Sequence, residues 1–115
     1  GVEYATTSPE YIRVLARRFV DAGAEIVIGS HPHVVGEREY YHEKYIYYSL
    51  GNFIFDQYWS DDVRRGLMAQ VVFDSRGVEY AEEISVELGR DRRTCPVTSA
   101  SGYTQRSESF GKEDI

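Results

Sequence analysis

Two histidines flank a proline in the stretch "GSHPH" (Gly29 to His33), which follows a short apolar run. That run, Ile26 to Ile28, is typical of a strand covered on both faces, and residues at the carboxyl end of such a strand often line a functional crevice. Pro32 favours an extended conformation for His31, which would let the side chains of His31 and His33 share a face. The pair could chelate one metal ion, or serve two ions about 3.5–4 Å apart.

An ordinary loop with two histidines is the competing interpretation, and the residues alone leave both open. Two imidazoles cannot complete a zinc site or a two-metal site, which needs further ligands. Gly29 favours the metal interpretation, because a glycine lets the backbone turn tightly and keeps side-chain bulk away from the ions. His42 is interpreted as an exposed turn residue, and Cys95 has no pattern of nucleophile partners around it.

Composition and charge narrow the classes of function. The chain has 115 residues, 42% of them hydrophobic, and a net charge of −6, which predicts one folded domain and no general nucleic-acid surface. No apolar run approaches the ~20 residues that span a bilayer. The first residue is Gly1 and the only methionine is Met68, so we expect a piece of a longer protein.

The first element that positions the histidines is a helix. Ser8 is the expected N-cap, Pro9 fits the first helical position, and Gly23 is expected just past the end. Its apolar stripe comprises Ile12, Leu15, Ala16, Phe19 and Val20. A strand at 26–28 follows, and its parallel partner is expected to end just before Gly1, which would place residues 1–4 and 29–33 at one edge of a sheet.

The second half changes to antiparallel β-structure. Aromatic runs around residues 42–44 predict a hairpin, and residues 75–77 predict a tight turn between two longer strands. In the second of these strands Ile84, Val86 and Leu88 alternate with Glu83, Ser85 and Glu87, the pattern of a half-buried strand. The chain is therefore α/β, with a domain at 1–88 and a polar tail at 89–115.

The stretches "GVEY", "IGSHPHV" and "YSLGNFIFDQ" together resemble the capsule-synthesis CapA family, also called the poly-gamma-glutamate synthesis family. The resemblance spans roughly Gly1 to Gln57 and continues more loosely to about Leu88. That family is similar to the calcineurin-like metallophosphoesterases. The resemblance implies that this chain is the carboxyl-terminal part of a metallophosphoesterase-like four-layer α/β/β/α sandwich.

The resemblance also implies roles for particular residues. His31 and His33 match late metal ligands that contact different ions of a binuclear centre, whose other ligands lie in earlier segments. Glu3 and Asn52 match recurrent positions near that centre and are expected to have orienting or substrate-side roles in catalysis. Asn52 has a second interpretation as a backbone cap after a glycine turn. Asp56 and Gln57 match the end of the last stretch and are expected to hold its loop.

Two functions follow from the resemblance. In the first, the longer protein is a hydrolase with two divalent ions (manganese, iron or zinc) that cleaves a phosphoester or an amide of polyglutamate. In the second, it is a non-catalytic scaffold or polymer-binding subunit beside membrane-bound polymer synthase subunits, with a local basic patch at Arg90, Arg92 and Arg93. The family suggests a membrane-anchored, extracytoplasmic protein. We expect the isolated chain to bind metal weakly and to be inactive.

Overall fold

The computed structural model describes residues 2–97, and Gly1 and residues 98–115 lie outside the described part. The helices are α1 (Glu10–Asp21) and α2 (Asp61–Arg64), and the strands are β1 (Ile26–Ile28), β2 (Arg38–Tyr41), β3 (Lys44–Tyr47), β4 (Arg65–Asp74), β5 (Gly77–Leu88) and β6 (Thr94–Pro96). One sheet has the order β1-β3-β2 and the other has the order β4-β5-β6. The mixed α/β class predicted from the sequence is confirmed.

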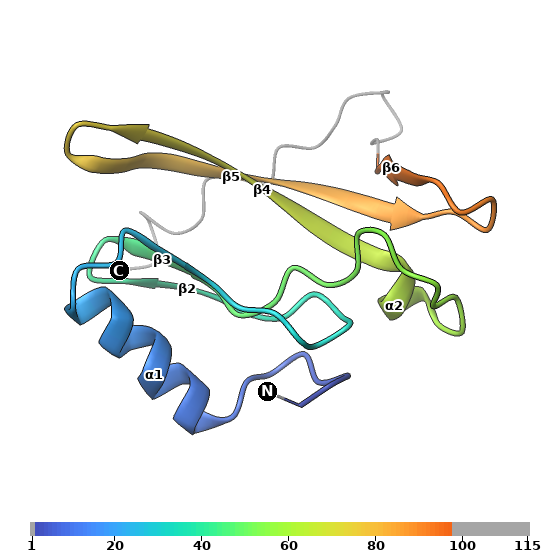
Figure 1. The fold of residues 1–115 in the computed structure, drawn as a ribbon, viewed down its shortest axis with the longest axis horizontal. Coiled ribbons are helices and arrows are strands. Elements are labelled where there is room, and N and C mark those ends of the chain that lie inside the picture. Colours follow the sequence, from blue (N-terminus) through green and yellow to red (C-terminus); the bar gives the residue numbers. More distant parts are fainter. Residues whose placement is uncertain (1, 98–115) are drawn as a thin grey trace.

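The described residues form three layers (Figure 1). α1 covers one face of the first sheet, where Ala16 and Val20 pack with Ile46 and Tyr48. The opposite face of that sheet packs against the β4-β5 hairpin through a core of Tyr45, Tyr47, Leu67 and Ala81. A second helical layer is not formed by residues 2–97, so the four-layer sandwich stays a prediction.

Of the two ends of α1, the sequence predicted the carboxyl end correctly and the amino end incorrectly. Gly23 has φ 110° and its N–H donates to the Val20 carbonyl, while the Ala24 N–H donates to the Phe19 carbonyl, which is a Schellman end as expected. The predicted start is wrong by one residue. Pro9 occupies the N-cap, and its side chain has no acceptor with which to cap the helix. The N–H of Ser8, the predicted cap, donates to the carboxylate of Glu37, 29 residues away.

The predicted hairpin at 42–44 is confirmed. β2 and β3 pair antiparallel from Tyr41 opposite Lys44, and the two turn residues His42 and Glu43 both have positive φ, 47° and 63°. Positive φ at both turn residues is the pattern of a type I′ turn, whose twist matches that of the strands. The predicted turn between β4 and β5 is also confirmed, with Asp74 opposite Gly77.

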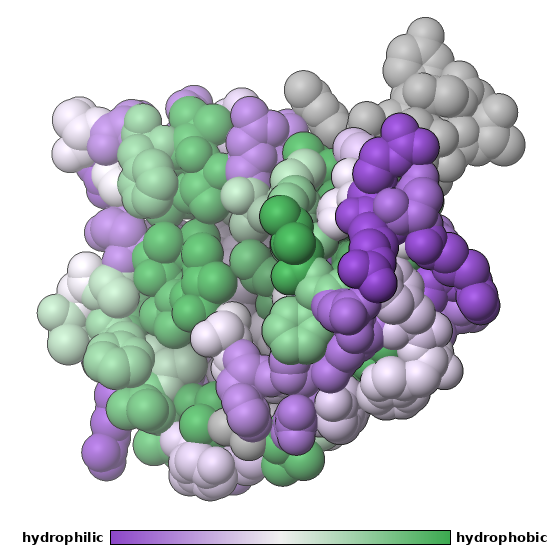
Figure 2. Space-filling view, turned by 45° about the vertical axis from the view of Figure 1, so that its right-hand side comes forward, coloured by the Kyte–Doolittle hydropathy of each residue, from purple (hydrophilic) through white to green (hydrophobic). Residues whose placement is uncertain are grey.

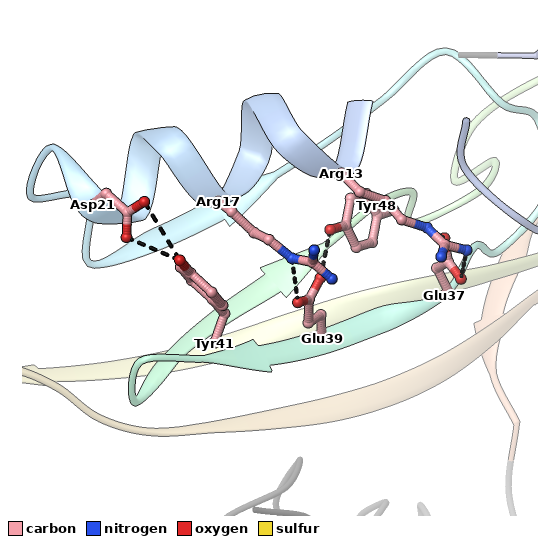
Figure 3. A network of polar contacts seen from close by, with 7 residues as sticks. All are labelled: Arg13, Arg17, Asp21, Glu37, Glu39, Tyr41 and Tyr48. Carbon is pink, nitrogen blue, oxygen red and sulfur yellow. Dashed lines mark hydrogen bonds and ion pairs between the residues drawn. The ribbon is translucent and has the colours of Figure 1, made fainter. Parts of the chain in front are cut away.

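Polar side chains join α1 to β2 and the residue before it (Figure 3). The three pairs are Arg13 with Glu37, Arg17 with Glu39, and Asp21 with Tyr41. Successive partners are four residues apart on the helix, about 6 Å, and two apart on the strand, about 6.6 Å. Because these repeats nearly match, one set of contacts fixes how α1 lies along the strand.

β5 departs from the alternation that its sequence suggests. Glu83, expected on the polar face, is 7% exposed and lies between the sheets, because both its carboxylate oxygens accept hydrogen bonds from the Arg38 guanidinium at 2.7 Å. Val86 and Leu88 are buried as expected. The range 89–115 predicted as a tail contains β6, which pairs with β5, and its residues 98–115 lie outside the described part.

Large apolar side chains remain exposed over the molecule, and Figure 2 shows a face where apolar residues form a broad area beside hydrophilic ones. Leu15 and Phe19 of the predicted helix stripe are 46% and 51% exposed, while Ala16 and Val20 are buried. Ile28 in β1 is 52% exposed. The helix stripe is therefore wider than the sheet surface that the described residues place beneath it.

Two buried tyrosines predict loss of stability in alkali. Burial, assisted by the Glu83 carboxylate, raises the pKa of Tyr47 to about 12 from 10.0. Burial and a hydrogen bond to Glu39 raise the pKa of Tyr48 as well. The folded chain thus holds these protons more tightly than the unfolded chain, so stability is intact below pH 10 and falls as pH rises from about 10 to 12.

We expect circular dichroism and tyrosinate absorbance, followed together in a pH titration, to change in that window. Tyr48→Phe removes one of the two ionisations and should make the fall in stability less steep. Formation of tyrosinate at all positions with no loss of dichroism would contradict this prediction.

Candidate metal centre

Parallel pairing of β1 with β3 brings the candidate residues to one edge of the first sheet. The carboxyl ends of parallel strands lie at the same edge, so the segment with His31 and His33 meets the segment with Asn52. The amino-terminal segment joins them, because the His33 N–H donates to the Glu3 carbonyl at 2.8 Å. The expectation that residues 2–4 and 29–33 share an edge is confirmed.

Gly29 is required by close backbone contact rather than by a turn. Its N–H donates to the Tyr47 carbonyl at 2.7 Å, and a Cβ at this position would collide with the Tyr48 carbonyl oxygen. Gly29 is not among the described residues with positive φ. The predicted tight turn at this glycine is therefore wrong, and the chain turns instead at His31.

His31 is not extended, contrary to the expectation drawn from Pro32. Its φ is 99°, a region that costs a non-glycine residue of the order of 1–3 kcal/mol. The His31 side chain is exposed, and within residues 2–97 it makes no hydrogen bond, ion pair or ring contact. The contacts among the described residues therefore bring Glu3 and Asn52 to His33 but leave His31 apart.

Ser49 holds the part of the loop that follows His31 in a bent conformation. Its hydroxyl is buried and shares its proton between the carbonyls of Pro32, at 3.0 Å, and Val34, at 2.8 Å. The Gly51 N–H donates to the same hydroxyl at 3.1 Å. Two carbonyls two residues apart can converge on one hydroxyl only when the chain between them bends. Sequence reasoning missed Ser49; its signal was one small polar residue between a buried aromatic run and a glycine.

His33 has both ring nitrogens in defined surroundings. Its Nδ1 lies 2.9 Å from Oδ1 of Asn52, and its ring packs 4.7 Å from that of Phe55 and 5.5 Å from that of Tyr4. The side chain is 20% exposed, so one side of the ring remains accessible. Nε2 lies 3.5 Å from Oε1 of Glu3.

The hydrogen bonds of Asn52 determine which nitrogen of His33 carries a proton. The amide is 5% exposed, and its Nδ2 donates to the Val63 carbonyl at 2.9 Å and to Oε1 of Gln57 at 3.2 Å. A carbonyl can only accept, so Nδ2 must face Val63 and Oδ1 must face His33. Oδ1 is also only an acceptor, so Nδ1 of His33 carries hydrogen and, in the neutral ring, Nε2 is left unprotonated.

An imidazole in this state fits a metal ligand. Metal-binding histidines coordinate through one unprotonated nitrogen and donate from the other to an oxygen that orients the ring. Asn52 supplies that oxygen here, which favours its predicted orienting role over that of a backbone cap. Within residues 2–97, however, no three His, Cys, Asp or Glu side chains lie close enough together to hold an ion.

Further residues close one side of the site. Gln57 Nε2 donates to the Tyr4 hydroxyl at 2.9 Å, so this side chain links the amino-terminal segment to Asn52. Trp59 packs edge-on against Tyr4 with ring centroids 5.1 Å apart. The predicted loop-holding role of Gln57 agrees with these contacts. Asp56 is exposed, and no role in the site follows from its position.

Comparisons with known proteins identify the family of the chain. The sequence model of the family described as "Bacterial capsule synthesis protein PGA_cap" matches residues 1–57, which include Glu3, His33 and Asn52. The chain belongs to this family of bacterial capsule synthesis proteins, as the resemblance in its sequence predicted.

Individual relatives cover more of the chain. It is 35% identical over 100 residues to "Capsule biosynthesis protein CapA" of Bacillus anthracis, covering 87% of this chain and 24% of the relative. It is 50% identical over 60 residues to "PGA biosynthesis protein CapA" of Bacillus subtilis (strain 168), covering 52% of this chain and 16% of that protein. "Uncharacterized protein y4sH" of Sinorhizobium fredii is 43% identical over 94 residues, covering 82% of this chain and 19% of that protein. The chain thus spans a quarter or less of the length of these relatives.

The role of Asn52 in fixing the ring of His33 can be tested by substitution. Asn52→Ala leaves the buried Val63 carbonyl without its donor and should lower the free energy of unfolding by about 1–3 kcal/mol. It should also allow both neutral tautomers of His33, which nitrogen-15 shifts of the imidazole distinguish. Asn52→Asp is the matched control, because it keeps an acceptor for Nδ1 while losing the donor to Val63. An unchanged tautomer in Asn52→Ala would contradict the assignment.

Proposed function

We propose that this chain contributes the late ligands of a binuclear metal-dependent hydrolase site to a protein of cell-surface poly-gamma-glutamate biosynthesis. The observation that carries the proposal is the contact between the buried amide of Asn52 and Nδ1 of His33, which in the neutral ring leaves Nε2 able to bind a metal ion. The names of the Bacillus relatives, which concern capsule and PGA biosynthesis, supply the biological setting.

The three described layers suit the proposed four-layer sandwich. The sheet β1-β3-β2 packs α1 on one face and the second sheet on the other, and the candidate residues lie at the carboxyl edge of its parallel pair. The fourth layer and the remaining ligands would be supplied by other parts of a longer protein. The relatives, of which this chain covers 16–24%, are long enough to contain them.

The residues of the chain have distinct roles in this proposal. Divalent ions, when bound, would polarise the scissile phosphoester or amide and lower the pKa of water at the site. His33 would hold an ion through Nε2, and Asn52 would keep the ring and its tautomer fixed. His31, exposed on a turned backbone, would reach a second ion. The rings of Tyr4 and Phe55 would limit water beside His33.

A specific feature favours the alternative of a polymer-binding subunit. The turn after β5 exposes Arg90, Arg92 and Arg93, a basic group that could contact a polyanion. Arg93 is paired with Asp91 at 2.7 Å, whereas the ion pairs among residues 2–97 do not include Arg90 or Arg92. This feature lies on the second sheet, so substitutions there can be separated from those at His33.

The proposal places the protein at the cell surface, as the capsule relatives suggest. Among residues 2–97, neither helix has the length and apolar character that crossing a bilayer requires. An anchor, membrane-bound polymer synthase subunits and the polyglutamate itself belong to the proposal for the longer protein.

The test uses a full-length family member that contains this chain or its equivalent. Replacing both His31 and His33 by alanine should reduce bound manganese, iron or zinc, and should reduce turnover of a chromogenic phosphoester or of a gamma-glutamyl amide by at least ~100-fold. His42→Asn is the matched control, because His42 lies in the exposed hairpin turn at φ 47°, which asparagine tolerates.

The outcome also separates the two candidate functions. Loss of metal and of polymer production together would support the hydrolase. Loss of metal with unchanged polymer production would show that hydrolysis is not what the pathway requires. Loss of polymer production in a variant with Arg90 and Arg92 replaced by alanine, with metal content intact, would favour the polymer-binding subunit.

A further inference from the structure

Nε2 of His33 and Oε1 of Glu3 lie 3.5 Å apart. In the neutral imidazole the contact with Asn52 places the one ring hydrogen on Nδ1, and Nε2 then has a lone pair. Oε1 of Glu3 belongs to a carboxylate and is also an acceptor. Beside the neutral ring this contact is not a hydrogen bond, so it gives no support to the orienting role expected of Glu3.

The 3.5 Å distance between Nε2 of His33 and Oε1 of Glu3 distinguishes a bridging water molecule from a bridging metal ion. At ordinary hydrogen-bond lengths of about 2.8 Å, a water bridging acceptors 3.5 Å apart would need an angle of roughly 80° at its oxygen, well below the angle between its O–H bonds. A zinc ion with a nitrogen and an oxygen ligand at about 2.0–2.2 Å in tetrahedral geometry separates them by about 3.4 Å. The observed distance fits a shared cation better than a shared water.

Glu3 is also held in place by contacts other than its side chain. Its carbonyl oxygen accepts the His33 N–H at 2.8 Å, so the two residues are tied through the backbone as well. The next residue, Tyr4, is held by Gln57, whose amide also contacts Asn52. The same set of contacts therefore positions both the carboxylate and the imidazole.

We propose that Glu3 is a direct metal ligand, which shares one divalent cation with Nε2 of His33. This inference rests on the proposed function and reassigns Glu3 from an orienting residue to a ligand. One imidazole and one carboxylate form a donor set that suits zinc, manganese or ferrous iron. The remaining coordination positions are left to water or to other protein groups.

The experiment measures zinc binding and the imidazole nitrogens of the 115-residue chain, labelled with nitrogen-15 at pH 7.5. Before zinc is added, His33 should show a protonated Nδ1 and an unprotonated Nε2, and zinc should shift the Nε2 signal. Glu3→Gln should lower zinc affinity at least about tenfold while leaving the tautomer unchanged, since its amide can donate to Nε2. Glu79→Gln, at an exposed position in β5, is the matched control and should bind zinc like the unmodified chain.

The variants separate failure of this inference from failure of the proposed function. Unchanged zinc affinity in Glu3→Gln, together with lost affinity in His33→Ala, would overturn the assignment of Glu3 alone. Unchanged affinity in His33→Ala would overturn the ligand assignment on which the proposed function depends. If both ring nitrogens of His33 carry hydrogen at pH 7.5, a proton on Nε2 occupies the position proposed for the cation. That result would overturn the inference. Backbone amide spectra of each variant establish that it remains folded.

Discussion

The fold depends on β3, because both of its faces are buried and both of its edges are paired. Alternate residues of the range Tyr45–Tyr48 face α1 and the second sheet, and all four are at most 5% exposed. β1 pairs with one edge of β3 and β2 with the other. Since Ser49 and Asn52 follow directly, the strand that forms the core also sets the position of the candidate site.

The site is stabilised by a small number of polar groups that have little freedom to rearrange. The Asn52 amide is buried, and leaving one of its partners without a hydrogen bond costs about 1–3 kcal/mol. Ser49 bends the histidine loop from the same segment. Both groups belong to the chain after β3, so the geometry of His33 is imposed from a neighbouring strand rather than by its own sequence.

This arrangement explains which features the sequence could predict. The Schellman end at Gly23 and the β2-β3 hairpin depend on residues that are neighbours in sequence, and both were predicted correctly. At two places a distant residue contacts the segment where the prediction failed: Glu37 at the start of α1 and Arg38 at Glu83. The extended conformation predicted for His31 also failed, and Ser49 binds the carbonyls of the loop just after it.

The candidate site residues likewise divide into features that the sequence could predict and features that depend on distant contacts. The strand–helix–strand pattern predicted that the segments with Glu3 and His33 share a sheet edge, whereas the resemblance to a family was needed to add Asn52. In the structure both Glu3 and Asn52 contact the ring of His33. The direction of the Asn52 amide, and hence the protonation of His33, follows from the Val63 carbonyl, for which no sequence pattern exists.

Electrostatics gives a reason for a cation at this site. The chain carries a net charge of −6, so an anionic ligand of any kind is repelled over most of the surface. A divalent ion between Glu3 and His33 would neutralise the carboxylate and leave a local positive charge. A neutral imidazole paired with a single carboxylate meets this requirement, whereas two carboxylates would cancel the charge of the ion.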